Sequence, residues 1–96
     1  MKITIKPFLT LRPVMRNLTK IELEVDDITL RELLDRLCEE FGGDLKNQVF
    51  DRKTHEVSNM VKVLVNGRHY TTLADKLGTL LKDGDEIALF PPVAGG

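Results

Sequence analysis

The amino-acid sequence predicts an α+β domain in which one main helix packs on one face of a mixed sheet of four to five strands. Three observations lead to this fold class. One long segment has apolar residues at the helical period, and several short segments alternate apolar and polar residues with period two. The chain has 96 residues, which is enough for one domain with a single core.

The first strand is predicted from apolar residues of one parity. These are Ile3, Ile5, Leu9 and Leu11, with Pro7 in phase between them. Proline has no N–H to donate to a sheet ladder, so we expect the regular strand to stop or bulge at Pro7.

A basic loop and a second strand follow. Residues 1–20 hold five basic side chains and no acidic one, and residues 12–19 read as a basic loop. Residues 20–25 alternate cleanly, which predicts a strand with Ile21, Leu23 and Val25 facing inward.

The main helix has the strongest local signals in the chain. Thr29 is the expected N-cap, and Glu32 three residues later completes a capping box. Ile28 and Leu33 fit a hydrophobic staple, and Gly42 is expected to end the helix. The apolar stripe comprises Leu30, Leu33, Leu34, Leu37, Cys38 and Phe41. Residues 42–59 are polar and are expected to be irregular, anchored by Leu45, Val49 and Phe50.

The last third of the chain predicts a hairpin and a final strand. Residues 61–65 alternate and run into Asn66-Gly67, a strong type I′ hairpin signal, with residues 68–70 as the return strand. Residues 73–81 predict one or two short helical turns, and residues 83–85 a turn. Residues 87–90 predict a strand buried on both faces, which Pro91-Pro92 then ends.

Composition excludes several classes of protein. With 42% hydrophobic and 30% charged residues, the chain is neither disordered nor membrane-embedded. Its 14 basic and 15 acidic residues nearly balance, and its few aromatic residues do not interleave with the basic loop, so nucleic-acid binding is disfavoured. A single cysteine excludes an intramolecular disulfide framework and a cysteine-based zinc site. We see no targeting segment and expect a cytoplasmic protein.

The C-terminus carries the most informative chemistry. Gly95 and Gly96 follow an apolar strand and two prolines, which stiffen the tail and hold it away from the body. Two glycines add no side-chain bulk, so the Gly96 carboxylate can enter a narrow channel. A carboxylate is a poor electrophile until another enzyme converts it to an acyl adenylate with ATP. The alternative is an ordinary frayed chain end.

These residues also resemble a known family. Residues 83–96, DGDEIALFPPVAGG, closely resemble the C-terminal signature of the small molybdopterin synthase subunit, in the ThiS/MoaD group of ubiquitin-like sulfur carriers. Residues 63–67 look like the central hairpin of that group, and Leu11-Arg12 resembles the residues after its first strand.

The resemblance implies a β-grasp fold with parallel, adjacent first and last strands. It implies that a ubiquitin-activating type adenylyltransferase adenylates Gly96 with ATP, and that the product is converted to a thiocarboxylate. The sulfur would then pass to a cyclic pterin inside the large subunit of molybdopterin synthase. The chain itself would bind no cofactor and would act as a carrier and not as an enzyme.

The resemblance also assigns roles to individual residues. Gly96 would carry the acyl group, and Gly95 would give clearance. The residues along the partner's groove would be Phe90, Pro91, Pro92, Val93 and Ala94. Residues 1–90 would form the β-grasp domain and residues 91–96 a flexible tail. Pro7 and the long polar segment 42–59 depart from the compact members and leave the branch of the family open.

Other candidate residues have simpler interpretations. Cys38 lies on the leucine stripe and is interpreted as a small core residue. His55 and His69 lack a third ligand in a motif, so no metal site is predicted. Ser58 has no nucleophile motif around it. The loop Arg12–Lys20 is interpreted as a hydrated surface, with an acidic partner or a phosphate as the alternative.

Three rival functions stay open at the level of sequence. The sulfur acceptor could be a thiazole precursor, a tRNA or another metabolite instead of a pterin. The activated Gly96 could be transferred to a lysine amine, which would make the chain a protein modifier. The chain could also be a non-covalent interaction module with an inert tail.

Overall fold

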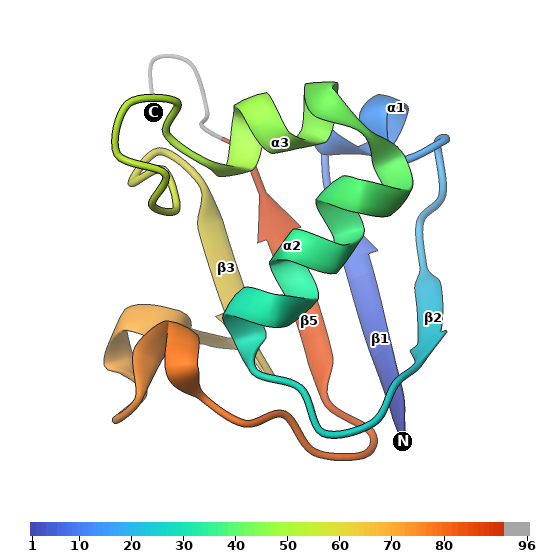
Figure 1. The fold of residues 1–96 in the computed structure, drawn as a ribbon. Helices are drawn as coiled ribbons and strands as arrows, with labels where there is room; N and C mark the ends of the chain where they lie inside the picture. The colour runs from blue at the N-terminus through green and yellow to red at the C-terminus, as the bar shows by residue number, and fades with distance from the viewer. Residues whose placement is uncertain (92–96) are drawn as a thin grey trace.

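Five strands form one mixed sheet in the order β2-β1-β5-β3-β4, in a computed structural model that describes residues 1–91 (Figure 1). The strands are β1 Lys2–Pro7, β2 Ile21–Glu24, β3 Lys62–Val65, β4 Arg68–His69 and β5 Glu86–Phe90. Strands β1 and β5 are parallel neighbours, and the other adjacent pairs are antiparallel. The predicted α+β fold and the adjacency of the first and last strands are therefore confirmed.

The main helix, α2 Leu30–Phe41, forms where the capping signals place it. Thr29 Oγ1 accepts a hydrogen bond from the Glu32 N–H at 3.2 Å, and Glu32 Oε1 accepts one from the Thr29 N–H at 3.0 Å. At the other end, Gly42 adopts a φ of 97°, a conformation that favours glycine. These local interactions fix both ends of the helix.

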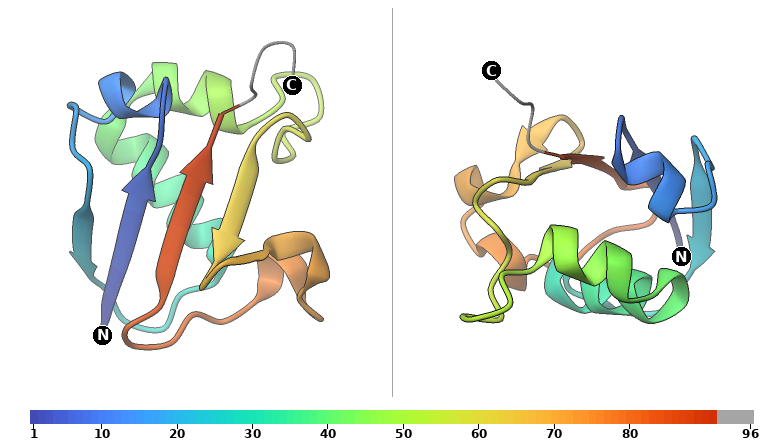
Figure 2. Two further views of the ribbon diagram at one scale, coloured as in Figure 1. Left: turned by 180° about the vertical axis from the view of Figure 1, so that it is seen from behind. Right: turned by 90° about the horizontal axis from the view of Figure 1, so that it is seen from above.

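Helix α2 lies across one face of the sheet, and the core lies between the helix and that face (Figures 1 and 2). Its buried residues are Leu30, Leu33, Leu34 and Leu37. The strands face it with alternate residues, which include Ile3, Ile5, Val63, Ile87 and Leu89. Within residues 1–91, no helix covers the opposite face of the sheet (Figure 2), which is called the open face below.

The first strand ends at Pro7, as predicted, and of the two apolar residues predicted to face inward beyond it, Leu11 is buried but Leu9 is not. The chain turns at Leu9, which has a φ of 53° and is 59% exposed. Helix α1 Leu11–Val14 then occupies part of the expected basic loop. It forms because one turn of helix buries Leu11, while the following residue, Met15, is also buried.

The segment expected to be irregular contains a helix, α3 Gly43–Val49. Leu45 and Val49 lie four residues apart on this helix and are both buried, and Phe50 after it is buried too. The three predicted anchors are therefore confirmed, whereas the expectation of an irregular backbone at 43–49 is wrong. Two apolar residues in seven give too weak a periodicity to predict a helix.

The hairpin between β3 and β4 has the predicted turn. Asn66 and Gly67 both have positive φ values, 51° and 84°. The return strand is shorter than expected, because Tyr70 begins a 3₁₀ turn, η1 Tyr70–Thr72, instead of extending β4. A second turn, η2 Lys76–Gly78, matches the expected short helical segment.

Strand β5 ends at Phe90, immediately before the two prolines. Ile87 and Leu89 are fully buried under α2, whereas Ala88 and Phe90 on the open face are only half-buried. The prediction that this strand is buried on both faces is therefore correct for one face only. The half-buried Phe90 is the last residue of β5, directly before the two prolines.

Candidate functional site

The candidate site is the end of β5, from which the C-terminal tail continues. This strand lies in the middle of the sheet and pairs with β1 on one side and with β3 on the other. Leu89 is opposite Pro7 of β1 and Val63 of β3, and Phe90 is opposite Lys62. The Phe8 N–H also donates to the Leu89 carbonyl at 3.0 Å. The body therefore holds the last strand firmly at the point where the tail begins.

An aromatic pair marks this exit. The rings of Phe8 and Phe90 stack with their centroids 4.4 Å apart and their planes at 5°. The Arg12 guanidinium lies over the Phe8 ring, 5.6 Å from its centroid. Arg12 Nε also donates to the Pro7 carbonyl at 3.2 Å. Because these contacts link β1, the start of α1 and β5, they hold the Phe90 ring in place.

A half-buried apolar surface extends from this pair across the open face. The open-face patch consists of Phe8, Leu64, Ala88 and Phe90. Leu64 of β3 is opposite Ala88 in the sheet register, so both side chains lie on one face. Two cations border the patch: Lys62, and Lys6, whose Nζ lies 3.0 Å from Glu86 Oε1. An apolar centre with a charged rim has the character of a protein-binding surface.

Sequence reasoning singled out Phe90 but missed Phe8 and Leu64 as its neighbours on this face. Phe8 directly follows β1, Leu64 lies in β3 and Phe90 lies in β5, and only the sheet register brings these distant segments together. The one available signal was parity. Phe8 is two residues after Lys6, so an extended backbone places both side chains on the open face. This holds although the regular strand ends at Pro7.

The structure describes only part of the predicted site. Phe90 is half-buried in the aromatic pair, and Pro91 is buried and is the last residue described. The other predicted residues, Pro92, Val93, Ala94, Gly95 and Gly96, lie outside the described residues. The proposed roles of the tail residues therefore stay predictions.

The chain's cysteine has the environment expected of a core residue. Cys38 is half-buried on α2 and packs against the hydrophobic core. Burial, and secondarily the neighbouring Asp35 carboxylate, raises the pKa of its thiol to about 11. The thiol therefore stays protonated at neutral pH, and its nucleophilic thiolate form is scarce.

The other side chains considered from the sequence have local structural roles. His69 Nδ1 lies 2.8 Å from Thr71 Oγ1, and Ser58 Oγ accepts from the Met60 N–H at 3.2 Å. Residues 1–91 contain no group of three or more His, Cys, Asp or Glu side chains arranged to hold a metal ion. None of the helices in that range combines the length and the apolar character needed to cross a membrane.

Residues 16–20 of the basic loop are exposed, as predicted, and its cations also contact the body. Arg16 pairs with Glu40 at 3.4 Å and lies 4.9 Å from the centroid of the Phe41 ring. Lys20 pairs with Glu22 at 3.4 Å. Together with the Arg12 contacts, these interactions attach the loop to α2 and to the two strands beside it.

Comparison with known proteins identifies the family. The ThiS family profile matches residues 9–96. Small archaeal modifier protein 3 from Haloferax volcanii is 36% identical over the full length of both chains. The solution structure of small archaeal modifier protein 1 from Methanosarcina acetivorans covers 99% of this chain and 96% of its own, at 28% identity and a TM-score of 0.81.

A third similar protein is named for molybdopterin synthesis and not for protein modification. It is a candidate molybdopterin converting factor, subunit 1, from Pyrococcus furiosus, which is 26% identical. The match covers 97% of this chain and 99% of that one, with a TM-score of 0.72. The family match includes the Gly-Gly end, and the relatives share the whole β-grasp body. The chain therefore belongs to the ThiS family of ubiquitin-like sulfur carriers and modifiers.

Proposed function

We propose that the chain is a sulfur carrier whose working group is the C-terminal carboxylate of Gly96. The observation that carries the proposal is the family match, which runs through residue 96 and so includes Gly95-Gly96. Its supporting geometry is that the last described residues end a central strand, whose Phe90 belongs to the open-face patch.

The chemistry requires a separate activating enzyme. A ubiquitin-activating type adenylyltransferase joins the Gly96 carboxylate to the α-phosphate of ATP and releases pyrophosphate. Hydrosulfide then attacks the carbonyl carbon of the acyl adenylate. The C–S bond forms, the C–O bond to AMP breaks, and AMP leaves with the electron pair. The product is a C-terminal thiocarboxylate, and the chain contributes a reactive end and not a catalytic side chain.

The proposed acceptor is the cyclic pterin precursor of molybdopterin, held in the large subunit of molybdopterin synthase. Two observations support it. Residues 83–96 resemble the C-terminal signature of the small synthase subunit, and one similar structure is a candidate molybdopterin converting factor subunit. In this role the chain donates its sulfur and returns to the carboxylate form.

The open-face patch is the proposed docking surface for both partners. Phe8, Leu64 and Phe90 present apolar area at the end of β5, so a partner that covers them is positioned to take the following residues into its own groove. Residues 90–95 are proposed to lie along that groove, with the Gly96 carboxylate at its end. A shared surface implies that the activating enzyme and the synthase bind alternately.

A second function is favoured by a specific similarity. The relative at 36% identity over full length is named a modifier protein. In this alternative, a lysine amine of a target protein attacks the activated Gly96 carbonyl and forms an isopeptide bond. Both functions need the same activation step and differ only in the nucleophile that follows it.

Intact-protein mass spectrometry tests the proposal. The chain is incubated with its activating enzyme, ATP and a sulfide source. A mass gain equal to the replacement of one oxygen by sulfur supports the carrier, and an isopeptide adduct to lysine supports the modifier. Cys38→Ala should load as well as the original chain, whereas a chain lacking Gly96 should not load. Loading of the shortened chain, or no mass change with an active enzyme, overturns the proposal.

A further inference from the structure

Strand β2 offers an unpaired edge. Among residues 1–91, it is the outermost strand of the sheet and pairs with β1 on one side only. Met1 and Val25 exchange two backbone hydrogen bonds, of 2.8 and 2.9 Å, at one end of this pair. The antiparallel ladder alternates from there, so Leu23 and Ile21 point their backbone groups toward β1. The backbone N–H and C=O groups of Glu22 and Glu24 therefore point outward from the sheet edge.

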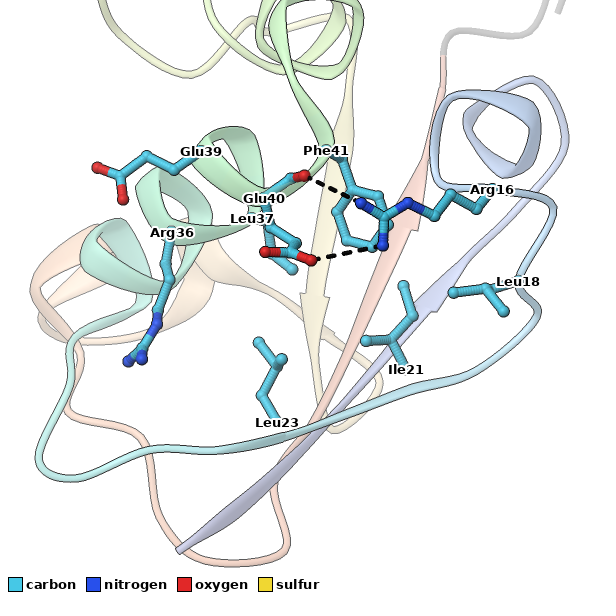
Figure 3. Close-up of a pocket in the computed structure, with 9 residues that line it drawn as sticks. All are labelled: Arg16, Leu18, Ile21, Leu23, Arg36, Leu37, Glu39, Glu40 and Phe41. Carbon is cyan, nitrogen blue, oxygen red and sulfur yellow. Dashed lines mark hydrogen bonds and ion pairs between the residues drawn. The ribbon is translucent and has the colours of Figure 1, made fainter.

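A groove runs along this edge, between β2 and α2 (Figure 3). The β2–α2 groove has a volume of about 460 Å³. Its apolar lining comprises Leu18, Ile21, Leu23, Leu37 and Phe41. Leu18 lies in the loop before β2, and its side chain is 41% exposed. Open backbone groups and an apolar lining thus lie side by side, which is the combination that strand addition uses.

Charged side chains flank the groove. Arg16 bonds to both the carboxylate and the backbone carbonyl of Glu40, each at 3.4 Å, and so bridges the loop before β2 to the end of α2 (Figure 3). Arg36 and Glu39 complete the charged rim along α2. The groove is therefore bounded by charged groups from α2 and from the loop before β2.

We propose that this groove binds an extended peptide segment of a partner protein, in which apolar and basic residues alternate, as an added strand on β2. Side chains of an added strand alternate between the two faces of the sheet. Those on the helix side would fill the β2–α2 groove, and those on the open face would lie opposite Glu22 and Glu24. This surface is separate from the tail and does not depend on Gly96 chemistry.

The charges along β2 select the partner. Glu22 is already paired with Lys2 and Lys20, at 3.3 and 3.4 Å. Glu24 is 74% exposed, and its nearest cation is the N-terminal ammonium at 3.8 Å. In the sheet register, Lys2 of β1 lies opposite Glu24 of β2. A basic residue of the added strand, placed opposite Glu24 on its other side, would give that carboxylate a second cross-strand cation. An acidic segment would be repelled at the same position.

A second copy of this chain does not fit the edge. Antiparallel pairing of β2 with itself would bring the carboxylates of Glu22 and Glu24 face to face across the new ladder, which is unfavourable. Charged residues on an edge strand discourage such unspecific pairing. The occupant must therefore bring complementary charges, which a basic and apolar segment does.

The test uses the full chain, labelled with ¹⁵N, and a short capped peptide that alternates lysine and valine. We expect saturable amide shifts confined to residues 18–24 and 36–41, with slowed solvent exchange of the Glu24 amide. Leu18→Asp should weaken binding about tenfold, because it puts a charge in the apolar lining. Leu80→Asp is the matched control, since Leu80 is 63% exposed and lies outside the groove.

Two further variants test the charge preference of β2 and the backbone hydrogen bonds of the added strand. Glu24→Lys should shift the preference from the lysine peptide toward an otherwise identical glutamate peptide, by up to about fivefold for one cross-strand pair. N-methylation of alternate peptide residues on the ladder side should abolish binding. Shifts centred on the open-face patch, equal binding of both peptides to the original chain, concentration-dependent shifts without peptide, or no shifts at millimolar peptide would each overturn the proposal.

Discussion

At the scale of single residues, the capping box is the clearest link from sequence to structure. Thr29 and Glu32 are three residues apart, so both partners of each hydrogen bond are visible in a short stretch of sequence. The prediction needed no knowledge of the sheet. It succeeded because the geometry of a helix N-terminus depends only on local backbone.

The same box gives a pH-dependent stability. Hydrogen bonds to the Glu32 carboxylate lower its pKa below the ordinary value of 4.5. The larger effect comes from the Thr29 N–H and the smaller one from the Thr29 hydroxyl. A carboxyl whose folded pKa is depressed stabilises the fold above its unfolded pKa, and this contribution is lost as the pH falls through the folded pKa. We therefore expect the original chain to lose stability relative to Glu32→Gln as the pH falls below about 4.5.

Urea unfolding of both proteins, between pH 7 and about pH 3, measures this difference. Glutamine keeps an acceptor for the Thr29 N–H but does not titrate. The other carboxyls that titrate in this range, including Glu22 and Asp51, are present in both proteins and cancel in the comparison. A difference that stays constant across the range would contradict the assignment.

The stacked rings of Phe8 and Phe90 are a residue-scale feature that the sequence could not reveal. They lie 82 positions apart, and only the parallel pairing of β1 with β5 brings them together. A double-mutant cycle of Phe8→Ala and Phe90→Ala should give a coupling free energy of about 0.5–1.5 kcal/mol in urea unfolding. Additive single effects would mean that the stacking contributes nothing beyond apolar burial.

At the scale of elements, the sequence predicted those whose signals are strong and local. Helix α2 has a full apolar stripe and two caps, and the β3–β4 hairpin has Asn66-Gly67. Helices α1 and α3 were missed because they are four and seven residues long and carry few apolar residues. Short helices are marginal on their own and form here through burial of Leu11, Leu45 and Val49.

The stripe of α2 should carry a large share of the stability. Leu34 and Leu37 are each only 1% exposed and face the sheet. Leu34→Ala should lower the free energy of unfolding by about 2–5 kcal/mol, through lost burial and the cavity left behind. Leu80→Ala, at a largely exposed position, should cost much less. A loss below about 1 kcal/mol for Leu34→Ala in urea unfolding would mean that the core closes without this side chain.

At the scale of the whole molecule, the described residues 1–91 form a packed body, and the proposed reactive group lies beyond it in the sequence. The buried core of residues 1–91 runs from Ile3 to Leu89, and its last member lies in the central strand that leads to the tail. The tail motif was visible in the sequence because it is contiguous. The open-face patch was not, because Phe8, Leu64 and Phe90 come from β1, β3 and β5 or their ends and meet only in the assembled sheet.

This separation predicts that changes at Gly95 affect the chemistry and spare the fold. Gly95→Val should abolish sulfur loading, because a β-branched side chain restricts the backbone and adds bulk where the partner's channel is narrow. The thermal midpoint should stay unchanged, since the core of the described residues ends at Leu89. Gly78→Val makes the same substitution at a position where an added Cβ meets nothing within 4 Å, and it should load normally. Intact-mass measurement of loading and thermal unfolding of all three proteins decide the outcome. Normal loading of Gly95→Val would show that the activating enzyme does not need a narrow tail, and the proposed threading of the chain end would fail.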